Sequence, residues 1–394
     1  MAKKSLILGA DPGFDGYKVA IITKELQKVY KLPFVVLDIT KNTDSYTTFG
    51  MNQDSIMYTT EDGKTILIGK RAQAALKTDS IYREHKEDVE GFNQISRFST
   101  PLFKNALIAA ISYSLYNFAV DYKKETGEEL YSPDDLSSID LKIGVALPHA
   151  HVDQYGPEIK SLLAEEHSGK LMVGKDESNI KFKAKDAYVG SQVLMALIGN
   201  IMNYKGTQIK DPKTPALLID AGYKTVGKAY VTDAQSLDGR DQSNTEYAMY
   251  NVDAHVISVF NNLPKSSKDI LTKDMIESGM EKIQYYDEIK QTVCEFNIKK
   301  AKESILRDFV RKFEEELEAD YNHFANIAQI AFVGGTGAAY YEPFIEVLEE
   351  KHLDIAKENT VLMDVELGKT KLEPVYAIAV GLAKNIASVT GCIK

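Results

Sequence analysis

Two segments of this chain share one pattern: an apolar strand, a turn that begins Asp-x-Gly, and a second apolar strand. They are, in chain order, Ser5–Gly9, Asp11–Gly16 and Tyr17–Thr23, then Ala216–Ile219, Asp220–Thr225 and Val226–Thr232. Apolar runs of strand length bounded by turn residues predict β-hairpins. Because the two hairpins lie about half the chain apart, we expect two similar halves, each built around one of them.

The residue types in these turns suit the binding of a polyanion. Glycine lets the backbone approach a ligand closely, and N–H groups in tight turns bind anions. Asp11 and Asp220 repel phosphate directly, but they can hold a magnesium ion through its retained waters. Lys18 adds a cation for phosphate oxygens, and Thr225 adds a hydroxyl. Each feature alone is more typical of an ordinary turn or a solvated lysine, whereas the combination favours a phosphate site.

A third glycine-rich segment, Gly334–Gly337, follows the apolar strand Ile327–Val333 and precedes a predicted helix. This context indicates close packing of a nucleoside, or phosphate binding at the helix N-terminus. Its spacing differs from the Gly-x-Gly-x-x-Gly of dinucleotide-binding proteins, and the sequence has no Gly-x4-Gly-Lys-Ser/Thr loop. The sequence therefore argues against a Rossmann-type or P-loop nucleotide site.

The order of these motifs resembles that of the actin, sugar kinase and heat-shock chaperone ATPase superfamily over nearly the whole chain. The segments that carry the resemblance are Asp11–Lys18, Asp220–Thr225, Phe332–Gly337 and Ala377–Leu382. The resemblance implies an α/β, actin-like fold, in which a duplicated ribonuclease H-like unit forms two domains with a nucleotide cleft between them. We expect domain I to comprise residues 1–205, with residues 375–394 packing back onto it, and domain II to comprise residues 206–374.

Within this superfamily, the chain most resembles the ParM-like plasmid-segregation actins. Asp62–Gly69 is similar to their early hairpin, and Gly144–Pro148 is similar to a strand and Leu-Pro corner that precede a helix. The resemblance implies subunits that bind ATP or GTP with Mg²⁺, polymerise into a filament and hydrolyse the nucleotide slowly. It also implies an adaptor protein that binds the plasmid centromere, so that contact with plasmid DNA is indirect. No residue in the sequence selects between the two purine bases.

The resemblance places the nucleotide contacts in three sets of residues. They are Gly13, Phe14, Asp15, Gly16, Tyr17 and Lys18 in the first turn, Gly222, Tyr223, Lys224 and Thr225 in the second, and Gly334, Gly335, Thr336 and Gly337 in the third motif. Asp11 and Asp220 are expected to hold the metal, largely through water, and so to contribute to catalysis. Related segregation actins often have an aspartate two residues beyond Thr225, where this chain has Gly227. This difference bears on hydrolysis and on metal placement, and therefore on the role expected for Thr225.

Two residues are candidates for orienting the attacking water. Val189–Gln192 matches the place where the related proteins carry a Glu or Gln that faces the nucleotide. A glutamine at a strand-to-helix junction can orient water for in-line attack on phosphorus, and its amide is a weak base, which predicts slow hydrolysis. A purely structural role at the start of a helix is the alternative for Gln192. Because the alignment is able to slip by several residues, Asp186 remains the second candidate.

Several further elements are predicted from periodicity and composition. A buried helix is expected over Leu102–Val120, a helix over Pro157–Glu166 with Pro157 in its first turn, a strand over Ile180–Val189, and mainly helices over Val252–Tyr321. The run Glu314–Glu316 is interpreted as a solvated helix face, His255 as a core histidine, and His149 and His151 as part of a surface turn rather than a metal site.

Composition narrows the remaining function classes. The net charge of −10 argues against direct binding to nucleic acid or to an anionic membrane. Two distant cysteines and the absence of a signal-peptide core or bilayer-length apolar run indicate a cytoplasmic protein without a membrane partner. The alternative function is a small-molecule kinase of the sugar-kinase type, which requires a carboxylate base; Asp186 is the candidate, and no sugar-kinase signature accompanies it.

Overall fold

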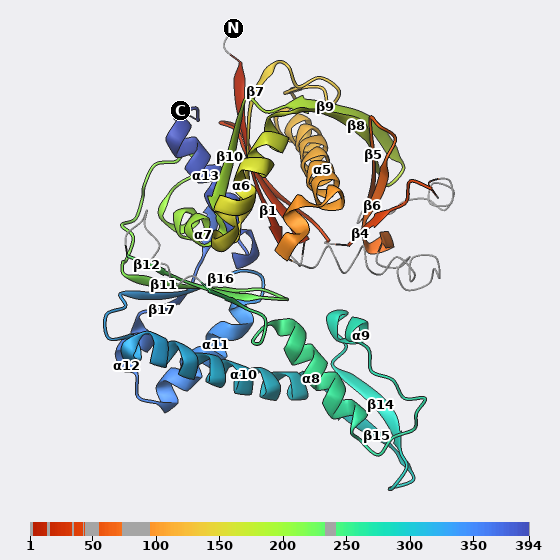
Figure 1. Ribbon diagram of the computed structural model, residues 1–394, viewed down its shortest axis with the longest axis vertical. Helices are drawn as coiled ribbons and strands as arrows, with labels where there is room; N and C mark the ends of the chain where they lie inside the picture. Colours follow the sequence, from red (N-terminus) through yellow and green to blue (C-terminus); the bar gives the residue numbers. More distant parts are fainter. Residues whose placement is uncertain are drawn as a thin grey trace. The chain divides into compact units, whose positions relative to one another are not determined.

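The computed structural model describes residues 3–13, 16–33, 35–41, 43, 55–72, 95–232 and 242–393. The chain forms two compact units (Figure 1). Unit 1 consists of Met1–Pro212 and Asp364–Lys394, and unit 2 of Lys213–Met363.

The main sheet of unit 1 has the strand order β10-β7-β1-β2-β3. Its strands are β1 (Lys4–Gly13), β2 (Gly16–Ile22), β3 (Gln27–Leu32), β7 (Ile139–Leu147) and β10 (Asp186–Ser191). β1 is antiparallel to β2 and parallel to β7, which is in turn parallel to β10. The near-continuous apolar sequences of β1, β2 and β7 follow from this arrangement, because a sheet covered on both faces buries every side chain along its central strands.

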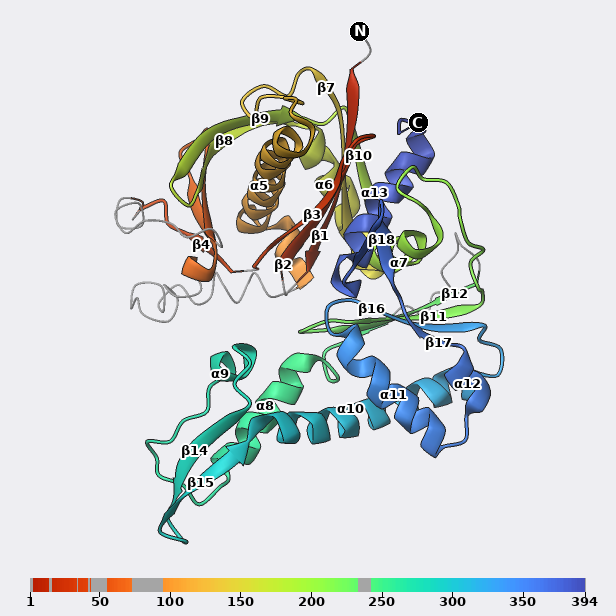
Figure 2. The ribbon, with the colours of Figure 1, turned by 180° about the vertical axis from the view of Figure 1, so that it is seen from behind.

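Helices cover both faces of this sheet. The alternate residues Leu6, Leu8 and Ala10 of β1 belong to the core shared with α5 (Pro101–Thr126) and α6 (His149–Ala164). On the opposite face α13 (Ala377–Thr390) packs on β1 and β7 and beside α7 (Gln192–Ile201) (Figure 2). Gly9 permits this close approach, since a Cβ atom there would lie 2.4 Å from the Ala379 carbonyl oxygen.

A second sheet of unit 1 has the order β4-β6-β5-β8-β9. Its strands are β4 (Val36–Asp38), β5 (Ser55–Thr60), β6 (Thr65–Gly69), β8 (Glu166–Val173) and β9 (Asp176–Lys183). The predicted hairpin at Asp62-Gly63 is confirmed as the β5–β6 turn, with Gly63 at φ +82°. α5 contacts strands of both sheets, which explains why the predicted helix over Leu102–Val120 is apolar around most of its circumference.

The sheet of unit 2 repeats the pattern of the main sheet of unit 1. Its order is β13-β12-β11-β16-β17. The strands are β11 (Ala216–Ala221), β12 (Val226–Val231), β13 (Gln242–Asn244), β16 (Gln329–Val333) and β17 (Thr360–Leu362). β11 is antiparallel to β12 and parallel to β16, as β1 is to β2 and β7. The duplication that the two Asp-x-Gly turns predict is therefore confirmed at the level of topology.

Helices of unit 2 pack on this sheet through apolar stripes. They are α8 (Met249–Asn261), α9 (Lys273–Glu277), α10 (Ile298–Asp320), α11 (Gly337–Glu350) and α12 (Asp354–Glu358). Phe313 and Leu317 of α10 share a core with Ile219 of β11 and Phe344 of α11. The other short elements are the 3₁₀ helices Ile95–Ser99, Asn322–Phe324 and Pro374–Tyr376 and the hairpin β18 (Val365–Leu367) and β19 (Thr370–Leu372). Because β18 packs on α7 and α13, unit 1 resumes at Asp364.

The prediction of mainly helices over Val252–Tyr321 is wrong in its middle part. An antiparallel hairpin, β14 (Lys282–Asp287) with β15 (Thr292–Asn297), stands between α9 and α10. One face of the hairpin packs through Tyr285 and Phe296 on Phe260 of α8. Residues that face α8 alternate with exposed residues along both strands. The sequence alone does not reveal this alternation, because charged residues interrupt both strands.

Four local predictions are also corrected. α6 begins directly after Pro148 and carries Pro157 in its interior, where the adjacent Gly156 packs against Val189 of β10. The segment expected as one strand over Ile180–Val189 is divided between β9 and β10, which belong to different sheets.

The remaining two corrections concern a histidine and a glutamate of unit 2. His255 is exposed rather than buried in the core. Glu314 is 0% exposed and pairs with Lys351, so α10 buries one carboxylate of the run that we interpreted as solvated. A buried carboxylate is tolerated when a cation compensates it, and burial nevertheless raises the pKa of Glu314.

Candidate functional site

The first hairpin places a buried ion pair at its tip. Asp11 lies opposite Lys18 in the β1–β2 register, and the Lys18 Nζ atom is 3.7 Å from Asp11 Oδ2. Asp11 is 3% exposed and Lys18 4% exposed. Lys18 is therefore not a solvated surface lysine, and its ammonium is held beside the carboxylate at the end of the central strand.

Gln192 joins this pair from a distant part of the chain. It begins α7 directly after β10, and its Nε2 donates a hydrogen bond of 2.7 Å to Asp11 Oδ1. Asp186 begins β10, about 16 Å along the strand from Ser191. The register pairs Asp186 with Lys142, and Ser191 with Leu147 at the end of β7. The structure thus brings Gln192, and not Asp186, to Asp11.

Arg97 is a further residue of this site that sequence reasoning missed. Its Nη2 donates a hydrogen bond of 2.9 Å to the carbonyl oxygen of Pro12, within the first turn. The guanidinium is 4.8 Å from the ring centroid of Phe98, and burial lowers the pKa of Arg97 to about 10, against the opposing effects of Tyr17 and Asp11. The arginine remains a cation at neutral pH. No local pattern marks it, because the contact joins two segments far apart in the sequence.

The other predicted residues of the first turn have different positions. Gly16 has φ +150°, and a Cβ atom there would lie 2.5 Å from the carbonyl oxygen of Leu32, so glycine is required by the neighbouring strand. Gly13 lies opposite Gly16 in the register. Tyr17 of β2 is buried in the core of unit 1, and burial raises its pKa. Phe14 and Asp15 lie outside the described residues.

The second hairpin, in unit 2, is built differently around its aspartate. Asp220 lies opposite Gly227 in the β11–β12 register, so no lysine faces it there. The turn closes with a hydrogen bond of 2.8 Å from the Gly222 N–H to the Thr225 carbonyl oxygen. Asp220, Lys224 and Thr225 are half-buried. This hairpin therefore presents its carboxylate and its turn residues in a more open setting.

The third glycine-rich segment lies against this second hairpin. Gly334 has φ +86°, and a Cβ atom there would be 2.3 Å from Asp220 Oδ1. Thr336 donates from its N–H to the Ala221 carbonyl oxygen over 3.1 Å, and its hydroxyl donates to the same oxygen. Gly335 is exposed, and Gly337 is the first residue of α11. Two of the three predicted nucleotide motifs are thus in direct contact within unit 2.

Tyr223 points from the second turn toward two helices. Its hydroxyl donates a hydrogen bond of 2.7 Å to Glu277 Oε1 on α9, and its carbonyl oxygen accepts one of 2.8 Å from Tyr250 N–H in α8. Burial and the neighbouring Glu277 raise the pKa of Tyr223. The side chain is therefore anchored away from the turn backbone.

The aspartates suit a hydrated magnesium ion better than a closed metal cage. Within the described ranges, no group of three or more His, Cys, Asp or Glu side chains is placed to hold a metal ion. Asp11 in unit 1 and Asp220 in unit 2 each offer a single carboxylate, and Mg²⁺ commonly keeps several waters when few carboxylates bind it. His149 and His151 begin α6, and the His151 ring packs against Phe98 and Tyr155.

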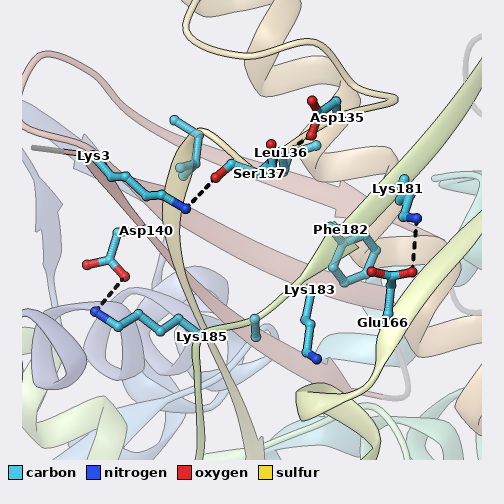
Figure 3. Close-up of a pocket in the computed structure, with 12 residues that line it drawn as sticks. Lys3, Asp135, Leu136, Ser137, Asp140, Glu166, Lys181, Phe182, Lys183 and Lys185 are labelled. Atoms are coloured by element: carbon cyan, nitrogen blue, oxygen red, sulfur yellow. Dashed lines mark hydrogen bonds and ion pairs between the residues drawn. The ribbon is translucent and has the colours of Figure 1, made fainter. Parts of the chain in front are cut away.

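A separate hollow of about 830 Å³ lies at the opposite end of the main sheet of unit 1 (Figure 3). Lys3, Asp140 and Lys185 line it, next to the starts of β1, β7 and β10, and Lys185 pairs with Asp140 over 3.3 Å. Asp11 is about 20 Å away along β1. The hollow is thus distinct from Asp11, Lys18 and Gln192, and of the predicted site residues Asp186 lies next to its lining residue Lys185.

Comparisons with known proteins identify the fold. No protein-family model matches the sequence, and no curated protein sequence does. Solved structures match along nearly the whole chain. The actin-like protein Alp7A has a TM-score of 0.64 at 15% identity, covering 98% of this chain and 96% of its own. Ta0583, an archaeal actin homolog in complex with ADP, has a TM-score of 0.59 at 14% identity, with 97% and 99% covered.

A third structure is a filament. AlfA from the B. subtilis plasmid pLS32 has a TM-score of 0.51 at 14% identity, covering 96% of this chain and 98% of its own. Together with the duplicated sheets, these similarities define the chain as a protein with an actin-like fold, as predicted. In the part of the chain that the structure describes, no helix is both long and apolar enough to cross a bilayer.

Proposed function

We propose that this chain is an actin-like nucleotidase that binds ATP or GTP with Mg²⁺, polymerises with copies of itself and hydrolyses the nucleotide slowly. Its proposed role is plasmid segregation in the cytoplasm, through an adaptor protein that binds centromere DNA. Two similar structures support the two main parts of the proposal: Ta0583 was solved with ADP, and AlfA was solved as a filament. The acidic net charge of −10 agrees with indirect contact with DNA.

The observation that carries the proposal is the cluster of Asp11, Lys18 and Gln192. The three side chains come from β1, β2 and α7, and they meet at the end of the central strand. A buried lysine and carboxylate are costly to desolvate, and this pair lies beside a turn whose glycines let the backbone approach a ligand. Phosphate binding would use both groups, since the ammonium matches phosphate oxygens and the carboxylate suits a hydrated Mg²⁺.

The remaining predicted residues take complementary roles in this proposal. Backbone N–H groups around Gly13 and after Gly222 bind phosphate oxygens, while the Gly222 N–H itself closes the second turn, and Lys224 and Thr225 contribute a cation and a hydroxyl. Asp220 acts with Asp11 on the hydrated metal, and Gly334–Gly337 accommodates the nucleoside at the start of α11. Magnesium would neutralise phosphate charge when bound.

Gln192 is proposed to orient the attacking water. Its Nε2 donates to Asp11, which fixes the plane of the amide. The amide Oε1 atom then accepts a hydrogen bond from water at a constant position relative to the first turn. An amide is too weak a base to take the proton fully, so hydrolysis should be slow.

Sedimentation with nucleotide tests the proposal. Mg²⁺ with ATP or GTP should convert the protein into a sedimentable polymer, and phosphate should be released as the polymer ages. Protein without nucleotide, and protein with nucleotide plus EDTA, should remain in the supernatant. Transfer of phosphate to an added sugar without polymer would instead establish the kinase alternative, and absence of nucleotide binding would contradict both functions.

Gln192→Ala tests the proposed role in hydrolysis separately. Polymer should still form, and phosphate release should slow by about 100-fold, the scale expected when a reacting group loses its positioning. Asn200→Ala is the matched control, because Asn200 also lies on α7 but donates to the Asp364 carbonyl oxygen instead. Unchanged phosphate release in Gln192→Ala would assign the water-orienting role to another residue.

A further inference from the structure

One residue, Tyr223, ties the turn of the second hairpin to both α8 and α9. Its carbonyl oxygen accepts a 2.8 Å hydrogen bond from Tyr250 N–H in the first turn of α8. Its hydroxyl donates over 2.7 Å to Glu277 Oε1 on α9, and lies 3.5 Å from Asp253 Oδ2 on α8. The backbone and the side chain of this turn residue are therefore held by different helices.

A lysine of α9 completes the contact. The Lys273 Nζ atom lies 4.4 Å from the ring centroid of Tyr223 and 3.9 Å from that of Tyr250. It is also 3.6 Å from Glu277 Oε1. An ammonium over two aromatic faces and next to a carboxylate is attracted by all three groups. Tyr223, Tyr250, Lys273 and Glu277 are called the tyrosine–lysine clamp below.

α9 is packed in turn on the β14–β15 hairpin. Ile276 of α9 is buried in a cluster with Phe260 of α8 and Tyr285 of β14. The cluster adjoins the core on the sheet, because α8 contributes to both and Ile305 of α10 packs against both. A shift of α9 therefore involves β14 and β15 directly, and it reaches the sheet beneath the Asp220 turn only through α8 and α10.

We propose that Tyr223 is a positioning residue that couples occupancy of the Asp220 hairpin by nucleotide phosphates to the position of α9. This inference rests on the proposed function, because it requires nucleotide at the second hairpin. Phosphate binding fixes the backbone between Gly222 and Thr225, and Tyr223 lies within that backbone. A fixed backbone places the hydroxyl and ring at the clamp, so nucleotide binding and the clamp stabilise one another. The coupling is reciprocal by thermodynamic linkage.

Hydrogen exchange of the segment 270–280 measures this coupling. The full chain is labelled below its polymerisation concentration, with and without Mg²⁺ and the non-hydrolysable analogues AMP-PNP and GMP-PNP. Nucleotide should slow exchange in this segment by about fivefold, the lower range of allosteric coupling. Tyr223→Phe, which removes one oxygen atom, should abolish the slowing and weaken nucleotide affinity by a similar factor.

Two further variants and a control define the role of the clamp. Lys273→Met should behave like Tyr223→Phe, and Lys273→Arg should retain the slowing because it retains the cation over both rings. Tyr286→Phe is the matched control, since Tyr286 is 45% exposed on β14. It should leave both measurements unchanged.

The outcomes separate the inference from the proposed function. Nucleotide that binds the wild-type chain without slowing exchange in residues 270–280 would overturn the coupling and leave the function intact. Full slowing in both Tyr223→Phe and Lys273→Met would overturn it as well. No binding of either nucleotide would overturn the function and the inference together.

Discussion

The two Asp-x-Gly hairpins occupy equivalent places in two sheets of the same topology, yet their neighbours differ. Asp11 is 3% exposed and has Lys18 across the strand pair and Gln192 at its side. Asp220 is half-buried, faces Gly227 across its strand pair, and is covered closely by Gly334. Two polar side chains contact the first aspartate, whereas the backbone of Gly334 approaches the second closely.

This difference predicts that the two hairpins contribute differently to stability and to ligand binding. The first hairpin contains a buried charge network whose members depend on one another, so its function and its stability are linked. The second hairpin keeps a partly accessible carboxylate, so changes there should affect a ligand more than the fold. Substitutions at equivalent positions test this division directly.

The largest difference is expected between Asp11→Ala and Asp220→Ala. Asp11→Ala leaves the buried Lys18 without that carboxylate and should lower the free energy of unfolding by about 3 kcal/mol. Asp220→Ala should lower it by about 1 kcal/mol or less, since the side chain is half-buried, while weakening Mg-nucleotide affinity by about tenfold or more. Urea denaturation and nucleotide titration measure the two effects.

A double-mutant cycle with Lys18→Met serves as the control for Asp11. The combined variant should be less destabilised than the sum of the single ones, by about 1 kcal/mol or more, because it removes both charges of a buried pair. Additive effects at Asp11 and Lys18, or equal losses of stability at Asp11 and Asp220, would show that the two hairpins are not held differently.

An intermediate effect is expected for Gly334→Ala. The added methyl group would approach Asp220 Oδ1 to 2.3 Å, and φ +86° is unfavourable for alanine, so unfolding free energy should fall by about 1–3 kcal/mol. The nucleotide affinity should fall with it. Gly335→Ala is the matched control, since Gly335 is the exposed neighbour without a positive φ. Similar denaturation midpoints for the two variants would contradict the close approach.

The smallest effect is expected for Gly227→Ala, at the position equivalent to Lys18. A Cβ atom there would lie 3.8 Å from the Asp220 Cβ atom, an ordinary contact. Alanine should therefore be tolerated, and it should stabilise the hairpin by up to about 1 kcal/mol because glycine is unfavourable inside a strand. A loss of more than about 1 kcal/mol in thermal denaturation would mean that Gly227 is required by a closer neighbour.

Sequence reasoning predicted most of the architecture but not the supporting residues of the site. The apolar strands, the two turns and the helices at α5, α10 and α11 have local signatures in periodicity and turn chemistry. Arg97 at Pro12 and the hairpin β14–β15 were missed. Both features depend on contacts with segments that are distant in the sequence. The local sequence around each of them contains no pattern that predicts those contacts.

The sequence by itself determined that two halves repeat a strand–turn–strand unit, because turn glycines and buried strands are encoded by neighbouring residues. It also singled out Asp11, Lys18 and Asp220 by residue type and position. Only the tertiary structure decided that Gln192 rather than Asp186 reaches Asp11, that Glu314 is buried with Lys351, and that Tyr223 points to α9. Those choices depend on strand register and helix packing, which bring together residues that the order of the chain leaves far apart.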